Sequence, residues 1–213
     1  HGEVAAEAVV RSLPLLLKSA LKSASRREPE ALKKQLCDAL ILLSDQIRDE
    51  SSQSAELEGM GSTVVAVLVT GCSCVVAHLG DSRAYLWRND ELELLTVDHS
   101  LVQLLMESGE ILPDELETHP ARGQLTRFVG MPAPALPEAR WFALQAHDRI
   151  MLCSDGISGM LSGMELAVIL GKDSSPDIAV RDLVDAANTA GGRDNLTSVL
   201  IQCEASRTSR QTV

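Results

Sequence analysis

The sequence predicts an α+β fold in which antiparallel β-sheets are covered by helices. Three observations predict it. The first fifty residues carry apolar side chains at helical spacing, the next stretch alternates strand-like runs with turns, and the remainder mixes strands with helices. A parallel α/β sheet would instead need regular strand–helix alternation along the chain. Hairpin-linked strands beside grouped helices therefore favour antiparallel sheets.

Two helices are expected before the first strand. In the first, from Gly2 to about Lys22, Ala, Val and Leu recur on one side, and Pro14 is expected to kink the helix. The second begins in SRREPE, with Pro29 in its first turn, where the missing proline N–H has no helical partner to lose. Its apolar stripe consists of Leu32, Leu36, Ala39, Leu40, Leu43 and Ile47.

Four strands are expected next, at Thr63–Thr70, Ser73–Leu79, Arg83–Arg88 and Leu92–Leu95, with RND as the hairpin turn between the last two. A short helix follows in HSLVQLLMESGE. The segment from Ile111 to Pro137 is rich in Pro and Gly. A long irregular segment of this kind is typical of a functional lid or flap.

The last third of the chain resumes the mixture. ARWFALQ, RIMLCS and NLTSVLIQCE are typical of strands, whereas GMELAVILGK and SPDIAVRDLVDAANTAG are typical of helices. Residues 1–204 are expected to form one domain, and the polar residues 205–213 are expected to form a disordered tail. The sequence opens at His1 without a Met, so we expect the natural start to lie upstream.

Charge and cysteine content narrow the class of protein. The chain of 213 residues has 19 basic and 30 acidic residues and a net charge of −11. This balance argues against a nucleic-acid backbone or an anionic membrane surface as the main partner. No apolar run reaches the length of a transmembrane helix. The five cysteines lie in apolar stretches, which favours buried, reduced thiols and points to a cytoplasmic protein.

Three acidic turns flank strongly apolar strands, around Asp81, Asp155 and Asp194. Each one alone is most simply a turn residue, because Asp bonds its own backbone and Gly accepts positive φ. Asp155 ends one expected strand and Asp194 precedes another, so their carboxylates converge if the strands are neighbours. Converging carboxylates repel unless a cation lies between them, and hard ions such as Mg²⁺ and Mn²⁺ prefer oxygen ligands. This chemistry favours a hydrolase that uses Mg²⁺ or Mn²⁺ to activate water.

An ordered set of motifs carries a family resemblance. GSTVVAVLV, AHLGDSRAYLWR, LTVDHS, LTRFVG, DRIMLCSDGISG and GGRDNLTSVLI together resemble the metal-dependent protein phosphatases of the PPM/PP2C type, particularly the bacterial ones. Phosphatases of the sporulation branch are a second possibility within the same fold. The resemblance implies a four-layer αββα sandwich and two or three Mg²⁺ or Mn²⁺ ions. It also implies that a metal-activated water attacks phosphoserine or phosphothreonine.

The resemblance also implies roles for individual residues. Asp155 in SDG and Asp194 in RDN match the aspartates that ligate the first metal, with Gly156 and Asn195 supporting them. Asp98 in LTVDHS matches the acid that helps to hold a third metal.

Other matched positions carry less specific roles. Asp81 and Arg83 are interpreted as a structural turn, either an Arg–Asp pair or a hairpin brace. His119 and Arg127 fall in the flap, where His119 is a candidate for substrate contact and Arg127 is more simply a brace. His1 is a candidate general acid.

The sequence also departs from the family pattern. The family's N-terminal strands, its phosphate-binding arginine and its DGxGG motif, whose aspartate bridges two metals, have no match in a sequence that starts at HGEVAAEAVV. One hypothesis is an active phosphatase whose opening strands lie upstream of His1. Its expected substrates are phosphorylated proteins, its possible functional partner is a Ser/Thr kinase, and it is expected to be a monomer. The alternative is a non-catalytic, phosphatase-like regulatory or binding module.

Overall fold

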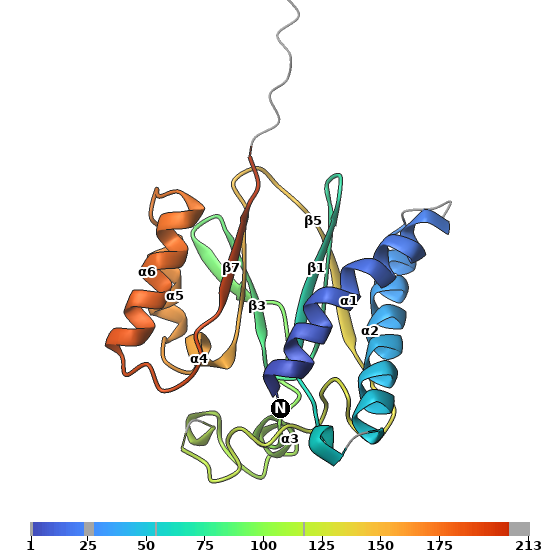
Figure 1. Ribbon diagram of the computed structural model, residues 1–213. Coiled ribbons are helices and arrows are strands. Elements are labelled where there is room, and N and C mark those ends of the chain that lie inside the picture. The colour runs from blue at the N-terminus through green and yellow to red at the C-terminus, as the bar shows by residue number, and fades with distance from the viewer. Residues whose placement is uncertain (1, 24–27, 54, 117, 205–213) are drawn as a thin grey trace, which may run out of the picture.

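The computed structural model describes residues 2–23, 28–53, 55–116 and 118–204 of the chain (Figure 1). The expected polar tail and the candidate general acid His1 lie outside these residues. The helices are α1 (Gly2–Ser23), α2 (Pro29–Ser52), α3 (Leu101–Glu107), α4 (Asp155–Ser158), α5 (Gly163–Leu170) and α6 (Pro176–Thr189), with 3₁₀ turns η1 (Ala55–Leu57) and η2 (Pro113–Glu115). The strands are β1 (Val64–Thr70), β2 (Ser73–Leu79), β3 (Arg83–Arg88), β4 (Glu91–Leu94), β5 (Glu138–Ala143), β6 (Arg149–Cys153) and β7 (Ser198–Gln202).

The strands form two antiparallel sheets, which confirms the α+β fold class. One sheet has the order β1-β2-β5 and the other has the order β4-β3-β6-β7. Helices α1 and α2 cover the outer face of the first sheet, and α5 and α6 cover the outer face of the second (Figure 1). The result is the expected four-layer αββα sandwich.

The β3–β4 hairpin forms at the predicted RND turn. Asn89 and Asp90 have φ angles of 52° and 64°, the left-handed conformation that a two-residue turn requires to match the twist of its strands. The register pairs Arg88 with Glu91 and Tyr85 with Leu94. Strand β4 therefore begins one residue earlier than the sequence predicted.

Strand β2 is buried on both faces, and its alternation separates two cores. Val75, Ala77 and Leu79 belong to the core between the first sheet and helices α1 and α2. Cys74 and Val76 belong to the core between the two sheets. A further core, which includes Met151, Leu166 and Leu183, lies between the second sheet and α4, α5 and α6.

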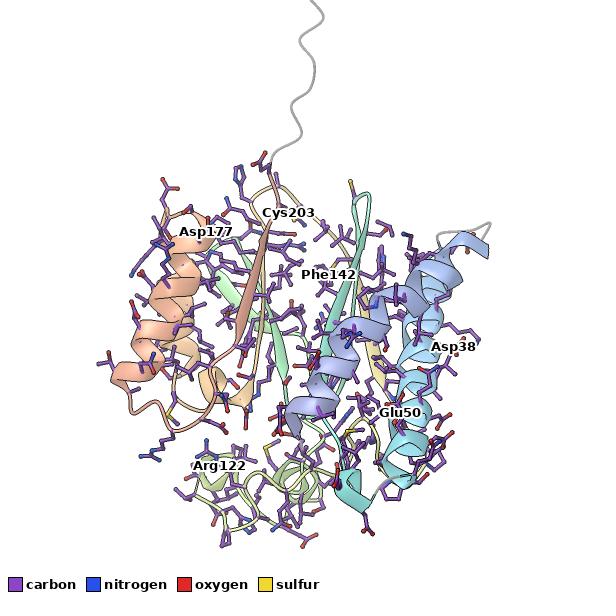
Figure 2. All side chains as sticks on the ribbon, viewed as in Figure 1. Asp38, Glu50, Arg122, Phe142, Asp177 and Cys203 are labelled. Carbon is purple, nitrogen blue, oxygen red and sulfur yellow. The ribbon has the colours of Figure 1, made fainter. Side chains whose placement is uncertain are left out.

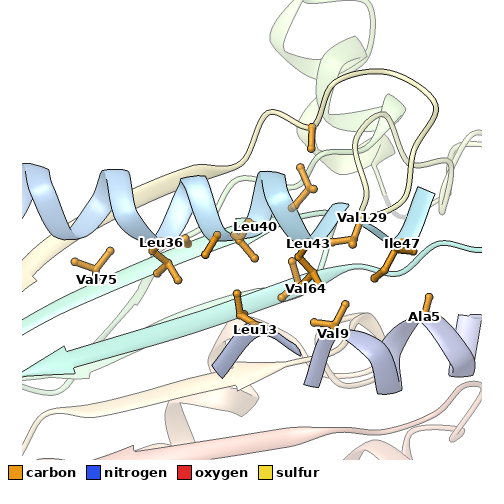
Figure 3. Packing of buried hydrophobic residues seen from close by; sticks show 14 of the residues in the cluster. Ala5, Val9, Leu13, Leu36, Leu40, Leu43, Ile47, Val64, Val75 and Val129 are labelled. Atoms are coloured by element: carbon orange, nitrogen blue, oxygen red, sulfur yellow. The ribbon is translucent and has the colours of Figure 1, made fainter. Parts of the chain in front are cut away.

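The predicted apolar stripe of α2 packs against β2 and β5. Figure 3 shows Leu36, Leu40, Leu43 and Ile47 on one side of the helix, facing α1 and the sheet. Helix α1 contributes Ala5, Val9 and Leu13 to the same core (Figure 3). The helix is continuous through Pro14.

The cysteines depart in part from the sequence-based expectation of buried thiols, because Cys37 and Cys203 are only half-buried and Cys72 is exposed. Cys74 and Cys153 are buried, and burial raises the pKa of each thiol to about 12, so both remain protonated. The expectation of a buried thiol is wrong for Cys72, which is exposed in the turn between β1 and β2. All five cysteines are unbridged. Among the described residues, no helix is both long and apolar enough to cross a bilayer.

Substitutions of two neighbouring leucines of α2 test how much the buried face of this helix contributes to stability. Leu43 is 1% exposed, whereas Leu42 is 48% exposed. Leu43→Ala is expected to lower the free energy of unfolding by about 2–5 kcal/mol, because the cavity it leaves adds to the lost apolar burial. Leu42→Ala is expected to change it by less than about 1 kcal/mol. Urea unfolding measures both, and equal losses would contradict the packing described.

Candidate functional site

A cavity of about 330 Å³ at one end of the sandwich collects four aspartates: Asp81, Asp98, Asp155 and Asp194. They come from four separate segments of the chain. Asp81 follows β2, Asp98 follows β4, Asp155 begins α4 directly after β6, and Asp194 lies between α6 and β7.

Strand register explains why distant acids meet. Strands β6 and β7 are antiparallel neighbours, and Cys153 at the end of β6 pairs with Ser198 at the start of β7. The convergence of Asp155 and Asp194 required their strands to be neighbours, and β6 and β7 are indeed paired. Cys153 also pairs with Arg83 at the start of β3, which places the turn that carries Asp81 at the same end of the sheet.

Hydrogen bonds fix the Asp155 turn to the Asp194 turn. The Ser154 hydroxyl donates to the Asn195 carbonyl (3.2 Å) and accepts from the Thr197 N–H (3.1 Å). The Ser154 N–H donates to the Thr197 carbonyl (3.1 Å). The Asn195 N–H in turn donates to Asp194 Oδ1 (2.7 Å), so the contact that orients this carboxylate comes from the backbone of Asn195.

Gly156 is required by the same close approach. A Cβ at this position would collide with the carbonyl oxygen of Asn195 and would also lie 3.2 Å from Leu196 Cδ2. The absence of a side chain therefore lets helix α4 approach the loop that leads into β7. Gly156 and Asn195, each of which directly follows one of the two aspartates, are therefore in close contact.

Asp98 has a guanidinium partner. Arg83 donates from Nε to Asp98 Oδ1 (2.9 Å) and from Nη2 to Asp98 Oδ2 (2.8 Å), a two-bond arrangement that matches the planar groups of both side chains. Arg83 does form a structural Arg–Asp pair, as the sequence predicted, but its partner is Asp98 and not Asp81. Arg83 braces the segment after β4 through Asp98, because the start of β3 faces that segment, while Asp81 lines the cavity.

The surroundings of Asp81 destabilise the charged form of its carboxyl group. Burial raises its pKa to about 6, and the neighbouring charges of Asp155 and Asp98 add to this effect. Among the described residues, no three of these aspartates bring carboxylate oxygens within 4.8 Å of one another.

A second group of titratable side chains lies beside the cavity. His78 and His99 are buried with stacked rings whose centroids are 4.5 Å apart, and His99 Nε2 lies 3.4 Å from Glu138 Oε1. Burial, together with the charges of His78 and Arg127, lowers the pKa of His99 to about 4, so this ring is neutral at pH 7. Nearly parallel rings do not aim their nitrogen lone pairs at one point, which is unsuited to metal binding.

One nitrogen of each histidine ring also lies in a hydrogen-bonding contact with the backbone. His99 Nδ1 accepts from the Gly80 N–H (3.2 Å), and His78 Nε2 lies 2.7 Å from the Val97 carbonyl. His78 is a buried residue of β2. Helix α3 is capped by Ser100, whose hydroxyl accepts from the Gln103 N–H.

The predicted flap contributes residues other than those expected. His119 Nδ1 accepts from the Ala121 N–H (3.1 Å) in a local turn, and His119 is not among the residues that line the cavity. Arg127 donates to Glu138 Oε1 (2.8 Å), which ties the flap to β5 as a brace. The flap residues that do line the cavity include Arg122 and Gly123.

Two cavity arginines were missed by the sequence analysis. Arg122 enters from the flap, and a Cβ at Gly159 would lie 2.8 Å from its Nη2 atom, so the guanidinium packs directly on α4. Figure 2 shows Arg122 at the end of the molecule opposite Asp177 and Cys203. Arg193 enters from the turn after α6. In the sequence, only the position of Arg193 beside Asp194 in GGRDN indicated that this arginine lies at the site.

Comparisons with known proteins agree with this architecture. A family model described as protein phosphatase 2C matches residues 1–200. The serine/threonine phosphatase stp of Listeria welshimeri is 33% identical over 202 residues, which cover 94% of this chain and 79% of the relative. A putative protein phosphatase 2C-type of Streptococcus pyogenes is 39% identical over 153 residues, and the match spans 62% of that relative's length.

Solved structures show the same similarity. The Mycobacterium tuberculosis serine/threonine phosphatase PstP/Ppp has a TM-score of 0.82 at 31% identity, covering 95% of this chain and 83% of that structure. A catalytic domain of PstP solved in complex with two manganese ions has a TM-score of 0.75 at 29% identity, covering 95% of this chain and 82% of that structure.

Gly156 and Gly163 form a matched pair of glycines at helix N-termini. Gly156→Ala is expected to lower the free energy of unfolding by about 1–3 kcal/mol, because its Cβ collides with the Asn195 carbonyl. A Cβ at Gly163 would meet nothing within 4 Å, so Gly163→Ala is expected to be neutral or stabilising by up to about 1 kcal/mol. Thermal and urea unfolding test the pair, and a neutral Gly156→Ala would refute the contact.

Asp81 gives the metal-free protein a pH-dependent stability. Its folded pKa of about 6 lies above the usual aspartate value near 3.9, so the folded state binds this proton more tightly than the unfolded state. Stability is therefore lost as the pH rises from about 4 to about 6. In EDTA, Asp81→Asn is expected to add up to about 2 kcal/mol at pH 7 and nothing at pH 3.5.

Urea unfolding across this pH range measures the effect. The exposed Asp185, on α6 outside the cavity lining, provides the control substitution Asp185→Asn, which is expected to leave the slope unchanged. A profile for Asp81→Asn parallel to that of the wild type would exclude the electrostatic conflict.

Proposed function

Because the chain belongs to the protein phosphatase 2C family, we propose that it hydrolyses phosphoserine and phosphothreonine in proteins with the help of Mg²⁺ or Mn²⁺. The observation that carries the proposal is the cavity in which Asp81, Asp98, Asp155 and Asp194 meet. The named phosphatases among its relatives support the reaction.

The donor set fits a hard divalent ion. Within the described part of the chain, the cavity lining contains four carboxylates and neither a histidine nor a cysteine. Oxygen-only sites of this kind suit Mg²⁺ and Mn²⁺, whereas Zn²⁺ sites usually include nitrogen or sulfur ligands. Burial raises the pKa of Asp81, and the nearby carboxylates of Asp155 and Asp98 raise it further; a cation among these groups would offset the second effect.

The geometry favours Asp155, Asp194 and Asp81 as the residues that hold metal. Asp155 and Asp194 are exposed to the cavity on two turns that are fixed to each other. The proposed third-metal role passes from Asp98 to Asp81, because Arg83 already neutralises Asp98. Asp98 then acts as a positioning residue, which holds Arg83 and the segment after β4 against the cavity wall.

Bound ions of this class activate water for attack on phosphorus and offset the charge of the phosphoryl group. The chain itself supplies the walls that orient the substrate. Helix α3 and the flap close one side through residues that include Gln103 and Gly123, while α4 forms the other side through Ser158 and Gly159. The cavity is open to solvent at Asp155 and Asp194, which gives a side chain on a protein surface access to the acids.

Loss of either fixed aspartate is expected to abolish the activity. Asp155→Asn and Asp194→Asn should each lower Mn²⁺-dependent hydrolysis of p-nitrophenyl phosphate and of a phosphothreonine peptide by about a hundredfold or more, because an amide replaces a charged metal ligand. Asp177→Asn removes the same charge from an exposed site on α6, far from the cavity, and is expected to retain full activity (Figure 2).

Isothermal titration with Mn²⁺ separates this proposal from the alternative of a non-catalytic module. An active phosphatase binds Mn²⁺ and turns over both substrates. Aspartate-dependent Mn²⁺ binding without turnover by the wild type would favour a phosphatase-like binding module. Turnover that survives both aspartate substitutions would refute the assigned site.

The proposed phosphoprotein substrate also raises the question of partners. We propose that a Ser/Thr kinase supplies these substrates and that the phosphatase acts as a monomer, which sedimentation analysis tests.

A further inference from the structure

The acidic cavity is not lined by acids alone. Three arginines reach it: Arg83, Arg122 and Arg193. Arg83 is held by two hydrogen bonds to Asp98. Arg122 packs against α4 at Gly159. Arg193 differs from both, because among the described residues its guanidinium has neither a hydrogen bond nor an ion pair.

A glycine-dependent turn holds Arg193 at the mouth of the cavity. Gly191 and Gly192 have φ angles of 137° and 51°, which side-chain-bearing residues rarely adopt. A Cβ at Gly192 would lie 2.9 Å from Asn188 Oδ1, so the turn also needs close contact with the end of α6. This backbone turns Arg193 back toward the cavity immediately before Asp194.

The Arg193 side chain lies along this turn. A Cβ at Gly191 would lie 3.7 Å from Arg193 Nε and 3.9 Å from Met160 Sδ, so the arginine and Met160 approach the same point. Both residues line the cavity.

Charge explains why a cation is useful here. The substrate of the proposed reaction carries a phosphoryl dianion, and the chain has a net charge of −11. Long-range repulsion therefore opposes substrate approach, although salt limits its reach to about 10 Å. An arginine at the mouth offsets this repulsion locally and offers a planar set of donors to an oxyanion.

We propose that Arg193 binds an oxyanion of the phosphorylated substrate at the mouth of the cavity. The inference rests on the proposed function for the class of substrate. The oxyanion comes from the phosphoryl group or from a carboxylate that flanks the phosphorylated residue, and both present the same chemistry to a guanidinium. Arg193 thus favours phosphorylated or acidic segments over neutral ones.

Peptide binding tests the proposal without requiring turnover. Three fluorescein-labelled peptides are titrated with the protein in Mn²⁺ and followed by anisotropy. The first carries a non-hydrolysable phosphonate analogue of phosphothreonine between neutral residues, the second carries the same analogue between acidic residues, and the third carries threonine between acidic residues.

Three variants accompany the wild type. Arg193→Gln removes the charge, Arg193→Lys keeps it without the planar fork, and Arg181→Gln removes the same charge from an exposed site on α6 outside the cavity lining. Arg193→Gln is expected to weaken phosphonate-peptide binding about three- to fivefold at low salt, with partial recovery in Arg193→Lys. The difference is expected to shrink as salt is raised.

The three peptides distinguish the two sources of the oxyanion. Weaker binding of the neutral-flanked phosphonate by Arg193→Gln assigns the contact to the phosphoryl group. Weakening confined to the acidic-flanked peptides assigns it to a flanking carboxylate. Unchanged binding in Arg193→Gln, an equal loss in Arg181→Gln, or no binding of any peptide by the wild type overturns the proposal.

A parallel assay of Mn²⁺-dependent p-nitrophenyl phosphate hydrolysis reports on the proposed function separately. Absent turnover with Arg193-dependent peptide binding would refute catalysis and retain the oxyanion contact. Aspartate-dependent turnover with binding that does not depend on Arg193 would retain catalysis and refute the contact.

Discussion

The close approach of the Asp155 turn to the Asp194 turn is the constraint on which the site depends. Backbone pairing of β6 with β7 brings the two turns together, and Ser154 then bonds to both Asn195 and Thr197. Only a glycine at position 156 permits this separation. These contacts hold Asp155 and Asp194 in the lining of one cavity, although their residue numbers differ by 39.

The aspartates that line this cavity repel one another, and the Arg83–Asp98 pair reduces this repulsion only in part. Asp98 is neutralised by the Arg83 guanidinium, whereas Asp81 is left with a pKa raised to about 6 by burial and by its acidic neighbours. The remaining negative charge opposes folding of the metal-free protein and favours cation binding by the same interaction. A metal ion bound at the proposed site would therefore couple folding stability to metal affinity through the same carboxylates.

The sequence predicted the elements better than it predicted the contacts. Helix α2, the β3–β4 hairpin and the buried strand β2 follow from periodicity and turn chemistry, which are local properties. The convergence of Asp155 with Asp194 required only that two strands be neighbours. The partner of Arg83 was not predictable in this way, because Asp98 is 15 residues away and comes within reach only after β3 and β4 pair.

The three arginines of the cavity show why residue type alone does not define a role. Arg83 is committed to a carboxylate, Arg122 is packed against a helix, and Arg193 is presented by a turn that two glycines make possible. Each guanidinium has the same chemistry, and the difference lies in the backbone that carries it. A strand start places one beside an acid, and the turn after α6 places another at the open mouth. The proposed oxyanion contact therefore depends on the turn before Asp194 as much as on the arginine within it.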